Sequence, residues 1–459
     1  MLFRGSTVAK GTENPRRVSV ATKALIVGDE CRFNDEADVL LFAADTALRS
    51  ANNGFVLISA ALVLMMTPAL ALFYAGFVRS RNVLNTMVMS FAAMGLVSVC
   101  WVLFGYSLAF SPGSGPFAPF IGGLQWAGLS NWSAPYGDGQ LSQGAVAFFQ
   151  LTFAIITPAL ISGAVVERMN FRAWLAFVLL WSTFIYLPLA HMVWGPGGFL
   201  GPEGLGALDF AGGLVVEMAS GVAAAVTAAV VGRRRNYPAH NAPPHNVPFI
   251  LLGAGLLWFG WFGFNGGSGL VAGNLASLAC LTTNTAGAAA ALGWMMLETI
   301  QRGKPTAVGV ATGAVAGLVA ITPAAGFVSP IGALVIGFAA ALLCNWALQL
   351  KNRSRLDDSL DVLPVHGVAG LLGILLTGVL ALASVNPAGA NGLLAGNPAQ
   401  LVIQLKAAGF TMLWVGVGTF VILKVLALLM PLRASDDEER QGLDINAHGE
   451  EAYNTEFTV

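Results

Sequence analysis

Two pairs of polar residues with the same spacing lie in otherwise apolar stretches of this sequence. Asp209 precedes Glu217 by eight residues in LDFAGGLVVE, and Asp358 precedes His366 by eight residues in DSLDVLPVH. An ionisable side chain within a membrane span costs roughly 2.5–3.5 kcal/mol on insertion scales, so it is rare without a function. Glu217 and His366 are therefore the first candidates for lining a polar path through lipid, and they indicate transport.

The composition of the chain also indicates a membrane protein. Hydrophobic residues make up 56% of the 459 residues, charged residues only 10%, and the mean hydropathy is +0.71, values outside the range of ordinary soluble domains. The 55 glycines suit helices that pack closely in a bilayer. A net charge of −1 argues against a nucleic-acid partner. We find no metal-binding cysteine spacing, no ATP-binding loop and no nucleophile motif, so we predict no metal, no cofactor and no enzyme activity.

Eleven apolar segments are long enough, or nearly so, to cross the hydrocarbon core, which needs about 20 residues. Their approximate centres are Leu62, Val97, Ile155, Leu179, Ala223, Leu256, Ala288, Leu318, Val335, Leu372 and Phe420. The segment around Leu318 is the shortest, because Pro323 and Pro330 interrupt it. The sequence thus predicts an all-α polytopic membrane protein with eleven transmembrane helices.

Basic residues alternate between the loops and so predict the orientation. Every second loop contains Arg or Lys, whereas the intervening loops contain neither: 111–142, 195–207, 266–275, 323–330 and 385–403. This alternation is the positive-inside signature. It predicts an N-terminus outside the cell and, after an odd number of spans, a C-terminus in the cytoplasm.

The same pattern divides the chain into three parts. Residues 1–50 are expected to be an extracytoplasmic N-terminal tail, residues 51–433 the transmembrane domain, and residues 434–459 an acidic cytoplasmic C-terminal tail. The acidic tail has two interpretations, a solvated and disordered end or a regulatory docking segment. The histidines outside the two pairs lie at span ends or in loops, and we interpret them as solvated or capping groups: His191, His240, His245 and His448.

Nine segments, in order along the chain, carry a resemblance to a known family. They are LVLMMTPALALFYAGFVRSRNVL (62–84), GYSLAF (105–110), FFQLTFAIITPALISGAVVERMNF (148–171), LAHMVWGPGG (189–198), LDFAGG (208–213), WFGWFGFNGGS (258–268), TTNTAGA (282–288), DDSLDVLPVHGVAG (357–370) and EERQGLDINAHGEEAY (438–453). Through them the chain resembles the ammonium transporter (Amt/Mep/Rh) family over about residues 45–452. The resemblance implies a homotrimer in the cell's inner (plasma) membrane. Each protomer would have its own pore, built from two inverted five-helix halves and a final helix.

The resemblance also implies roles for particular residues. The external vestibule that captures ammonium would contain Phe153, Trp194 and Ser268, through cation–π contacts and one hydrogen bond. Asp209 would order this binding site from beneath, and its own position predicts an N-cap. Without the resemblance, Phe153 and Trp194 would be interpreted as core or interfacial aromatics. A pair of stacked rings, Phe149 or Phe153 together with Phe264, would close the pore.

The sequence departs from the family pattern at Glu217. Most members carry two facing histidines in the pore, and this chain keeps only the second, His366. A Glu–His pair can hold a carboxylate and an imidazolium or a neutral acid and an imidazole, and burial and the neighbouring charge shift the carboxyl pKa in opposite directions. Glu217 is interpreted as half of a proton-carrying pair, with a structural salt bridge as the alternative.

The function predicted from these residues is ammonium uptake. Ammonium would be recruited outside, deprotonated, and conducted as ammonia, with proton co-transfer through Glu217 and His366. One alternative is an ammonium sensor that signals through the tail, and another is a less selective ammonium/potassium channel. The resemblance implies one further partner, a cytoplasmic PII-type signal protein.

Overall fold

The computed structural model describes residues 25–27, 30–32, 36–235, 237 and 243–453. In this part of the chain ten helical segments are long and apolar enough to cross a membrane, and α10 (Ala307–Ile321) is a shorter apolar helix. Each of the eleven expected centres lies inside one of these helices. The expected all-α polytopic membrane fold is confirmed, with α10 as the short segment around Leu318.

The elements up to the middle of the chain are β1 (Leu25–Val27), β2 (Glu30–Arg32), α1 (Glu36–Phe77), η2 (Ser80–Asn82), α2 (Val83–Cys100), η3 (Trp101–Gly105), α3 (Tyr106–Phe110), η4 (Gly115–Phe117), η5 (Ala127–Leu129), β3 (Pro135–Tyr136), β4 (Leu141–Ser142), α4 (Gln143–Ser162), α5 (Phe171–Trp181), η6 (Ser182–Tyr186), α6 (Leu187–Trp194), η7 (Gly213–Met218) and α7 (Ala219–Val231). The remaining elements are α8 (Val247–Trp261), η8 (Phe262–Gly266), α9 (Asn274–Arg302), α10, α11 (Pro330–Arg353), η9 (Leu363–Val368), α12 (Ala369–Leu380), η10 (Leu393–Ala395), α13 (Pro398–Leu429), α14 (Asp436–Gln441) and α15 (Leu443–His448). The two strand pairs, β1–β2 and β3–β4, are short antiparallel hairpins.

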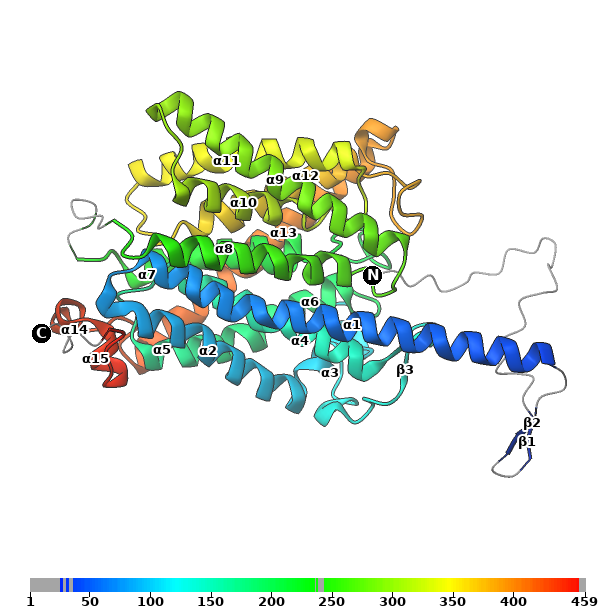
Figure 1. The fold of residues 1–459 in the computed structure, drawn as a ribbon. Helices are drawn as coiled ribbons and strands as arrows, with labels where there is room; N and C mark the ends of the chain where they lie inside the picture. Colours follow the sequence, from blue (N-terminus) through cyan, green and yellow to red (C-terminus); the bar gives the residue numbers. More distant parts are fainter. Residues whose placement is uncertain (1–24, 28–29, 33–35, 236, 238–242, 454–459) are drawn as a thin grey trace, which may run out of the picture.

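The spans lie side by side in one bundle (Figure 1). Among the described residues, five spans precede the loop after α7, and five long spans and the shorter α10 follow it. Helix α1 packs against α8 between the halves, and α13 packs against α7 and α12. The start of α1 and the tail helices α14 and α15 lie at opposite ends of the bundle (Figure 1). Helix α1 begins at Glu36, so it extends into residues 36–50, which we had assigned to the N-terminal tail.

The C-terminal tail is folded onto the bundle. The Asp444 carboxylate accepts backbone N–H groups of Leu84 at 3.1 Å and Asn85 at 2.7 Å, and the Leu443 N–H donates to Asn82 Oδ1 at 2.8 Å. An acidic side chain at the start of α2 satisfies donors that have no partner inside the helix. The interpretation of the tail as a disordered end is therefore wrong for residues 434–453.

His191 also differs from its expected surroundings. It is fully buried near the end of α6, and its ring nitrogens lie 3.0 Å from the Ala109 carbonyl oxygen and 2.8 Å from that of Ala118. Its assignment as a solvated or capping group is wrong, because the loop after α3 folds back over this end of α6 and its backbone replaces water. His240 lies outside the described residues.

Candidate functional site

Asp209 holds the start of the span that carries Glu217. Its carboxylate is buried and accepts backbone N–H groups of Gly212 (2.8 Å), Gly213 (2.6 Å), Leu214 (2.7 Å) and Val215 (3.4 Å). Gly212 has φ +113°, a left-handed conformation that few other residues adopt, and this turn aims the N–H groups at the carboxylate. The next turn, η7, is π-helical and contains Glu217. Asp209 thus performs the role expected of an N-cap from three residues before the N-cap position itself, which is Gly212.

Asp358 repeats this arrangement in the second half of the chain. Its carboxylate accepts the N–H groups of Val362 at 3.1 Å and Leu363 at 2.7 Å, at the start of the π-helical turn η9 that contains His366. Burial, with the nearby Asp361 carboxylate, raises the pKa of Asp358 to about 6, against the opposing effects of Lys351 and of the two N–H groups. Each half thus starts its interrupted span with a carboxylate and places a polar side chain eight residues later.

Glycines let the two interrupted spans touch through their backbones. A Cβ atom on Gly221 would lie 2.1 Å from the Gly367 nitrogen and 2.2 Å from its Cα, and one on Gly370 would lie 2.8 Å from the Met218 nitrogen. Small residues at a helix crossing are what allow such close approach in membrane proteins. We had not identified these glycines as part of the site, although they lie in or beside the quoted segments.

Glu217 and His366 meet at this crossing. Glu217 Oε2 lies 2.8 Å from His366 Nδ1, and the two residues are only 1% and 4% exposed. At this distance the two groups share a hydrogen bond, and its proton can reside on either partner. We refer to Glu217 and His366 as the polar pair.

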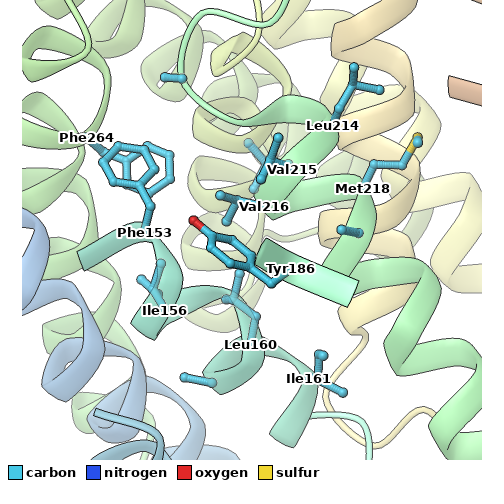
Figure 2. Close-up of a cluster of buried hydrophobic side chains, with 14 of the residues drawn as sticks. Phe153, Ile156, Leu160, Ile161, Tyr186, Leu214, Val215, Val216, Met218 and Phe264 are labelled. Carbon is cyan, nitrogen blue, oxygen red and sulfur yellow. The ribbon is translucent and has the colours of Figure 1, made fainter. Parts of the chain in front are cut away.

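Two phenylalanine rings stack close to the polar pair. The ring centroids of Phe153 and Phe264 are 4.2 Å apart with an interplanar angle of 25°, and Figure 2 shows the two rings overlapping. Phe149 contacts Phe153 edge-on, at 4.9 Å and 65°. Of the two alternatives for the stacked rings, the structure thus places Phe153 against Phe264, with Phe149 beside Phe153. We refer to Phe153 and Phe264 as the ring pair.

A narrow cavity lies against the polar pair and one ring of the ring pair. Its lining includes Phe264, Glu217 and His366, with an otherwise apolar wall to which Ile156, Leu160 and Val216 of Figure 2 belong. It offers about 10 Å³ for the centre of a water-sized molecule, close to the minimum that one such molecule needs. We refer to it as the pore cavity.

The remaining vestibule residues, Trp194 and Ser268, each contact one member of the ring pair. Trp194 lies edge-on to Phe153, with centroids 6.1 Å apart at 88°, and its Nε1–H donates to the Asp209 carbonyl oxygen at 3.2 Å. Ser268 donates to the Phe264 carbonyl oxygen at 2.8 Å and lines a wider outer cavity of about 520 Å³. The structure thus joins Trp194 to Phe153 and Asp209, while Ser268 lies one turn beyond Phe264.

These features define a class of protein: a multi-pass membrane protein whose two interrupted spans place a carboxyl group and an imidazole behind a pair of stacked rings. Residues 54–453 match the model of the Ammonium Transporter Family. An ammonium transporter of Bacillus subtilis (strain 168) is 48% identical over 402 residues, covering 87% of this chain and 97% of its own. The chain belongs to the ammonium transporter family.

Solved structures agree with this assignment. Mep2 of Saccharomyces cerevisiae has a TM-score of 0.78 at 36% identity, covering 84% of this chain and 88% of its own. A structure described as a sensor Amt protein has a TM-score of 0.79 at 28% identity, covering 88% of this chain and 99% of its own. The proteins that this chain resembles thus include one named as an ammonium transporter and one named as a sensor.

Proposed function

We propose that this protein takes up ammonium across the plasma membrane through a path inside each protomer. The observation that supports this best is the pore cavity, a water-sized and largely apolar space lined by Phe264 and by both members of the polar pair. Such a space suits a small neutral molecule, because a hydrated ion would lose its water there without replacement.

Recruitment begins where Trp194 contacts Phe153 of the ring pair. Trp194 and Phe153 present faces that attract a cation, a contact worth roughly 1–2 kcal/mol when water is excluded. The Ser268 hydroxyl is half-buried at the wall of the outer cavity and can accept an N–H bond from the bound ion. Asp209 acts as a positioning residue, since its carboxylate is occupied by backbone N–H groups and its carbonyl oxygen orients Trp194.

Deprotonation follows because a cation in the pore cavity has too few partners. NH4+ gives up one proton to become NH3, which keeps its lone pair and carries no charge. Neutral ammonia then passes the ring pair once the stacked rings part, and it crosses the pore cavity without a large desolvation cost.

The released proton travels by way of the polar pair. The 2.8 Å contact lets the proton move between Glu217 Oε2 and His366 Nδ1, and the carboxyl group gives the pair a charge state that a neutral imidazole pair lacks. On the far side ammonia regains a proton, so one positive charge crosses for each ammonium taken up. Transport is thus electrogenic.

We propose the orientation and assembly of the protein on separate grounds. The loops rich in arginine lie at the end of the bundle that carries the folded tail, and the positive-inside rule assigns this end to the cytoplasm. Family membership supports a homotrimer and a PII-type signal protein as a cytoplasmic partner. Both are tested by the mass of the purified protein, alone and with that partner.

Current recordings on reconstituted protein test the proposed path. Glu217→Gln keeps the size and hydrogen bonding of the side chain but removes its titratable charge, so the ammonium-evoked current should fall sharply. Glu298→Gln is the matched control, because Glu298 is a buried glutamate that accepts N–H and O–H bonds from Thr306 at the end of α9, outside the pore cavity. A Glu217→Gln protein with wild-type current and unaltered pH dependence would show that Glu217 is structural.

Ammonium sensing is the second function that a specific observation favours. The tail is docked on the start of α2 by Asp444, so a change at that end of the bundle can reach the tail. A pure sensor binds ammonium without restoring growth of a transport-deficient strain on low ammonium.

The third alternative is a less selective ammonium/potassium channel. Potassium and methylammonium, added in the current recordings described above for Glu217→Gln, test this alternative.

A further inference from the structure

A basic cavity lies at the tail-bearing end of the bundle, away from the pore. Its volume is about 260 Å³, and its arginines come from three separate parts of the chain. Arg79 and Arg81 lie between α1 and α2, Arg234 and Arg235 follow α7, and Arg440 belongs to α14. We refer to it as the tail cavity.

The two glutamates of the tail cavity are already paired. Glu167 accepts the Arg79 backbone N–H at 2.9 Å and has Arg234 Nη1 at 3.3 Å. Glu439 is held by Arg433 at 2.5 Å, from outside the cavity lining. Five arginines against two glutamates leave the lining with an excess of three positive charges.

That excess resides in side chains for which the described part of the chain provides no acceptor. Arg234 pairs with Asp357 at 2.8 Å and Arg440 pairs with Asp437. By contrast, within the described ranges, no side chain or carbonyl oxygen accepts a hydrogen bond from the guanidinium groups of Arg79, Arg81 or Arg235. The positive-inside pattern accounts for basic residues in these loops, but it does not require three unpaired guanidinium groups to converge on one cavity.

We propose that the tail cavity binds a phosphate-class oxyanion, supplied by the headgroup of an anionic lipid or by a soluble phosphate compound. Guanidinium groups are planar forks that match phosphate oxygens in pairs, and a multiply charged anion balances the excess charge better than a carboxylate does. The cavity is several times the roughly 30 Å³ that a water molecule occupies in the liquid, so a phosphate group and part of its hydration fit. Basic pockets at the ends of transmembrane helices hold cardiolipin and related headgroups in this way.

The bound anion also ties the tail to the bundle. Arg440 lies on α14, whereas Arg79 and Arg81 lie just before α2, so one anion in the cavity contacts both parts. The occupied cavity thus adds to the hydrogen bonds of Asp444 in holding the tail. The site is independent of ammonium conduction and requires none for its test.

Two binding measurements on the purified full-length protein distinguish the sources of the anion. In the first, pyrophosphate is titrated into protein in phosphatidylcholine nanodiscs, and binding is measured as a rise in the thermal unfolding temperature. The second is native mass spectrometry of the protein with cardiolipin, compared with phosphatidylcholine. Saturable pyrophosphate binding identifies a soluble ligand, and selective retention of cardiolipin identifies a lipid headgroup.

The variant that tests the site combines Arg79→Gln, Arg81→Gln and Arg235→Gln. We expect it to weaken binding by about tenfold or more, because each change removes charge-assisted hydrogen bonds. The matched control combines Arg302→Gln, Lys304→Gln and Arg353→Gln, which removes the same charge from exposed residues at the same end of the bundle. The control should bind as the wild type does.

Two outcomes overturn the proposal: wild-type protein that binds neither probe, and equal losses in the two triple variants, which would indicate only general surface charge. If the first triple variant fails to fold, Arg235→Gln alone replaces it. Limited proteolysis of the wild type gives a further readout, because the anion should slow cleavage of residues 434–453.

Discussion

The two interrupted spans share a backbone arrangement and differ in the side chains that it presents. In the first half Asp209 accepts four backbone N–H groups and η7 presents Glu217. In the second half Asp358 accepts two such groups, lies beside the Lys351–Asp361 ion pair, and η9 presents His366. The same framework thus places an acid in one half and an imidazole in the other.

This difference shows that the position of the midspan side chains and their chemical character are set by different residues. The caps and the π-helical turns fix where the midspan side chains lie, whereas the identity of each side chain decides which charges the pore can hold. The ring pair, like the polar pair, takes one residue from each half: Phe153 comes from the first half and Phe264 from the second. Changes to the caps should therefore affect mainly folding, whereas changes to the presented side chains should affect conduction as well as folding.

The largest effect is expected from breaking the polar pair. His366→Ala leaves the Glu217 carboxyl group buried without its partner, a change that costs about 3–5 kcal/mol when a buried pair is broken. Both the thermal stability in detergent and the ammonium current should fall. Glu217→His, which puts an imidazole in both halves, is the comparison variant and should retain transport. A stable and fully active His366→Ala protein would contradict the pairing.

A smaller effect is expected from the caps, and it should be unequal. Asp209→Asn replaces one acceptor oxygen with a donor that faces backbone N–H groups, so we expect a loss of about 2–3 kcal/mol in unfolding free energy. Asp358→Asn affects fewer hydrogen bonds, and we expect a loss of about 1 kcal/mol. Thermal unfolding of the two variants side by side measures the difference, and equal losses would show that the two caps are equivalent.

The Asp358 variant should also change the pH dependence of stability. Because the folded-state pKa is raised to about 6, the folded protein holds this proton at pH values where the unfolded chain has lost it. Its contribution to stability therefore falls as the pH rises from about 4 to about 6. Asp358→Asn should remove that part of the slope.

The smallest effects are expected in the vestibule, from Trp194 of the first half and Ser268 of the second. Trp194→Leu removes a cation–π contact worth about 1–2 kcal/mol, and Ser268→Ala removes one hydrogen bond worth about 1 kcal/mol. Both should raise the ammonium concentration needed for half-maximal current and leave the maximal current less affected. An equal loss at every concentration would instead indicate a damaged fold or a closed pore.

Much of the fold could be predicted from the sequence because lipid imposes simple rules on it. Each span needs a long apolar run, and basic loops alternate, so the eleven helices could be identified without any contacts. The prediction was weaker where residues distant in sequence meet. Phe149 and Phe153 are both one or more turns into α4, and periodicity alone does not choose which of them stacks on Phe264.

The tail and His191 show the same limit. An acidic segment such as residues 434–453 is compatible with solvent, and it is ordered by contacts such as those of Asp444 with the N–H groups at the start of α2. His191 is likewise buried by a loop that lies some 70–80 residues earlier in the chain. Neither partner can be recognised from the local sequence.

The sequence by itself determined the number of spans, the family and the residue types of the polar pair, because these depend on local composition and on spacing along one chain. Only the tertiary structure decided that Glu217 and His366 touch, since their contact depends on Gly221 and Gly367 at a crossing of two helices. It also decided that three arginines face one cavity with no acceptor for their guanidinium groups among the residues that the structure describes. Both are properties of distances between separate segments, and packing sets those distances.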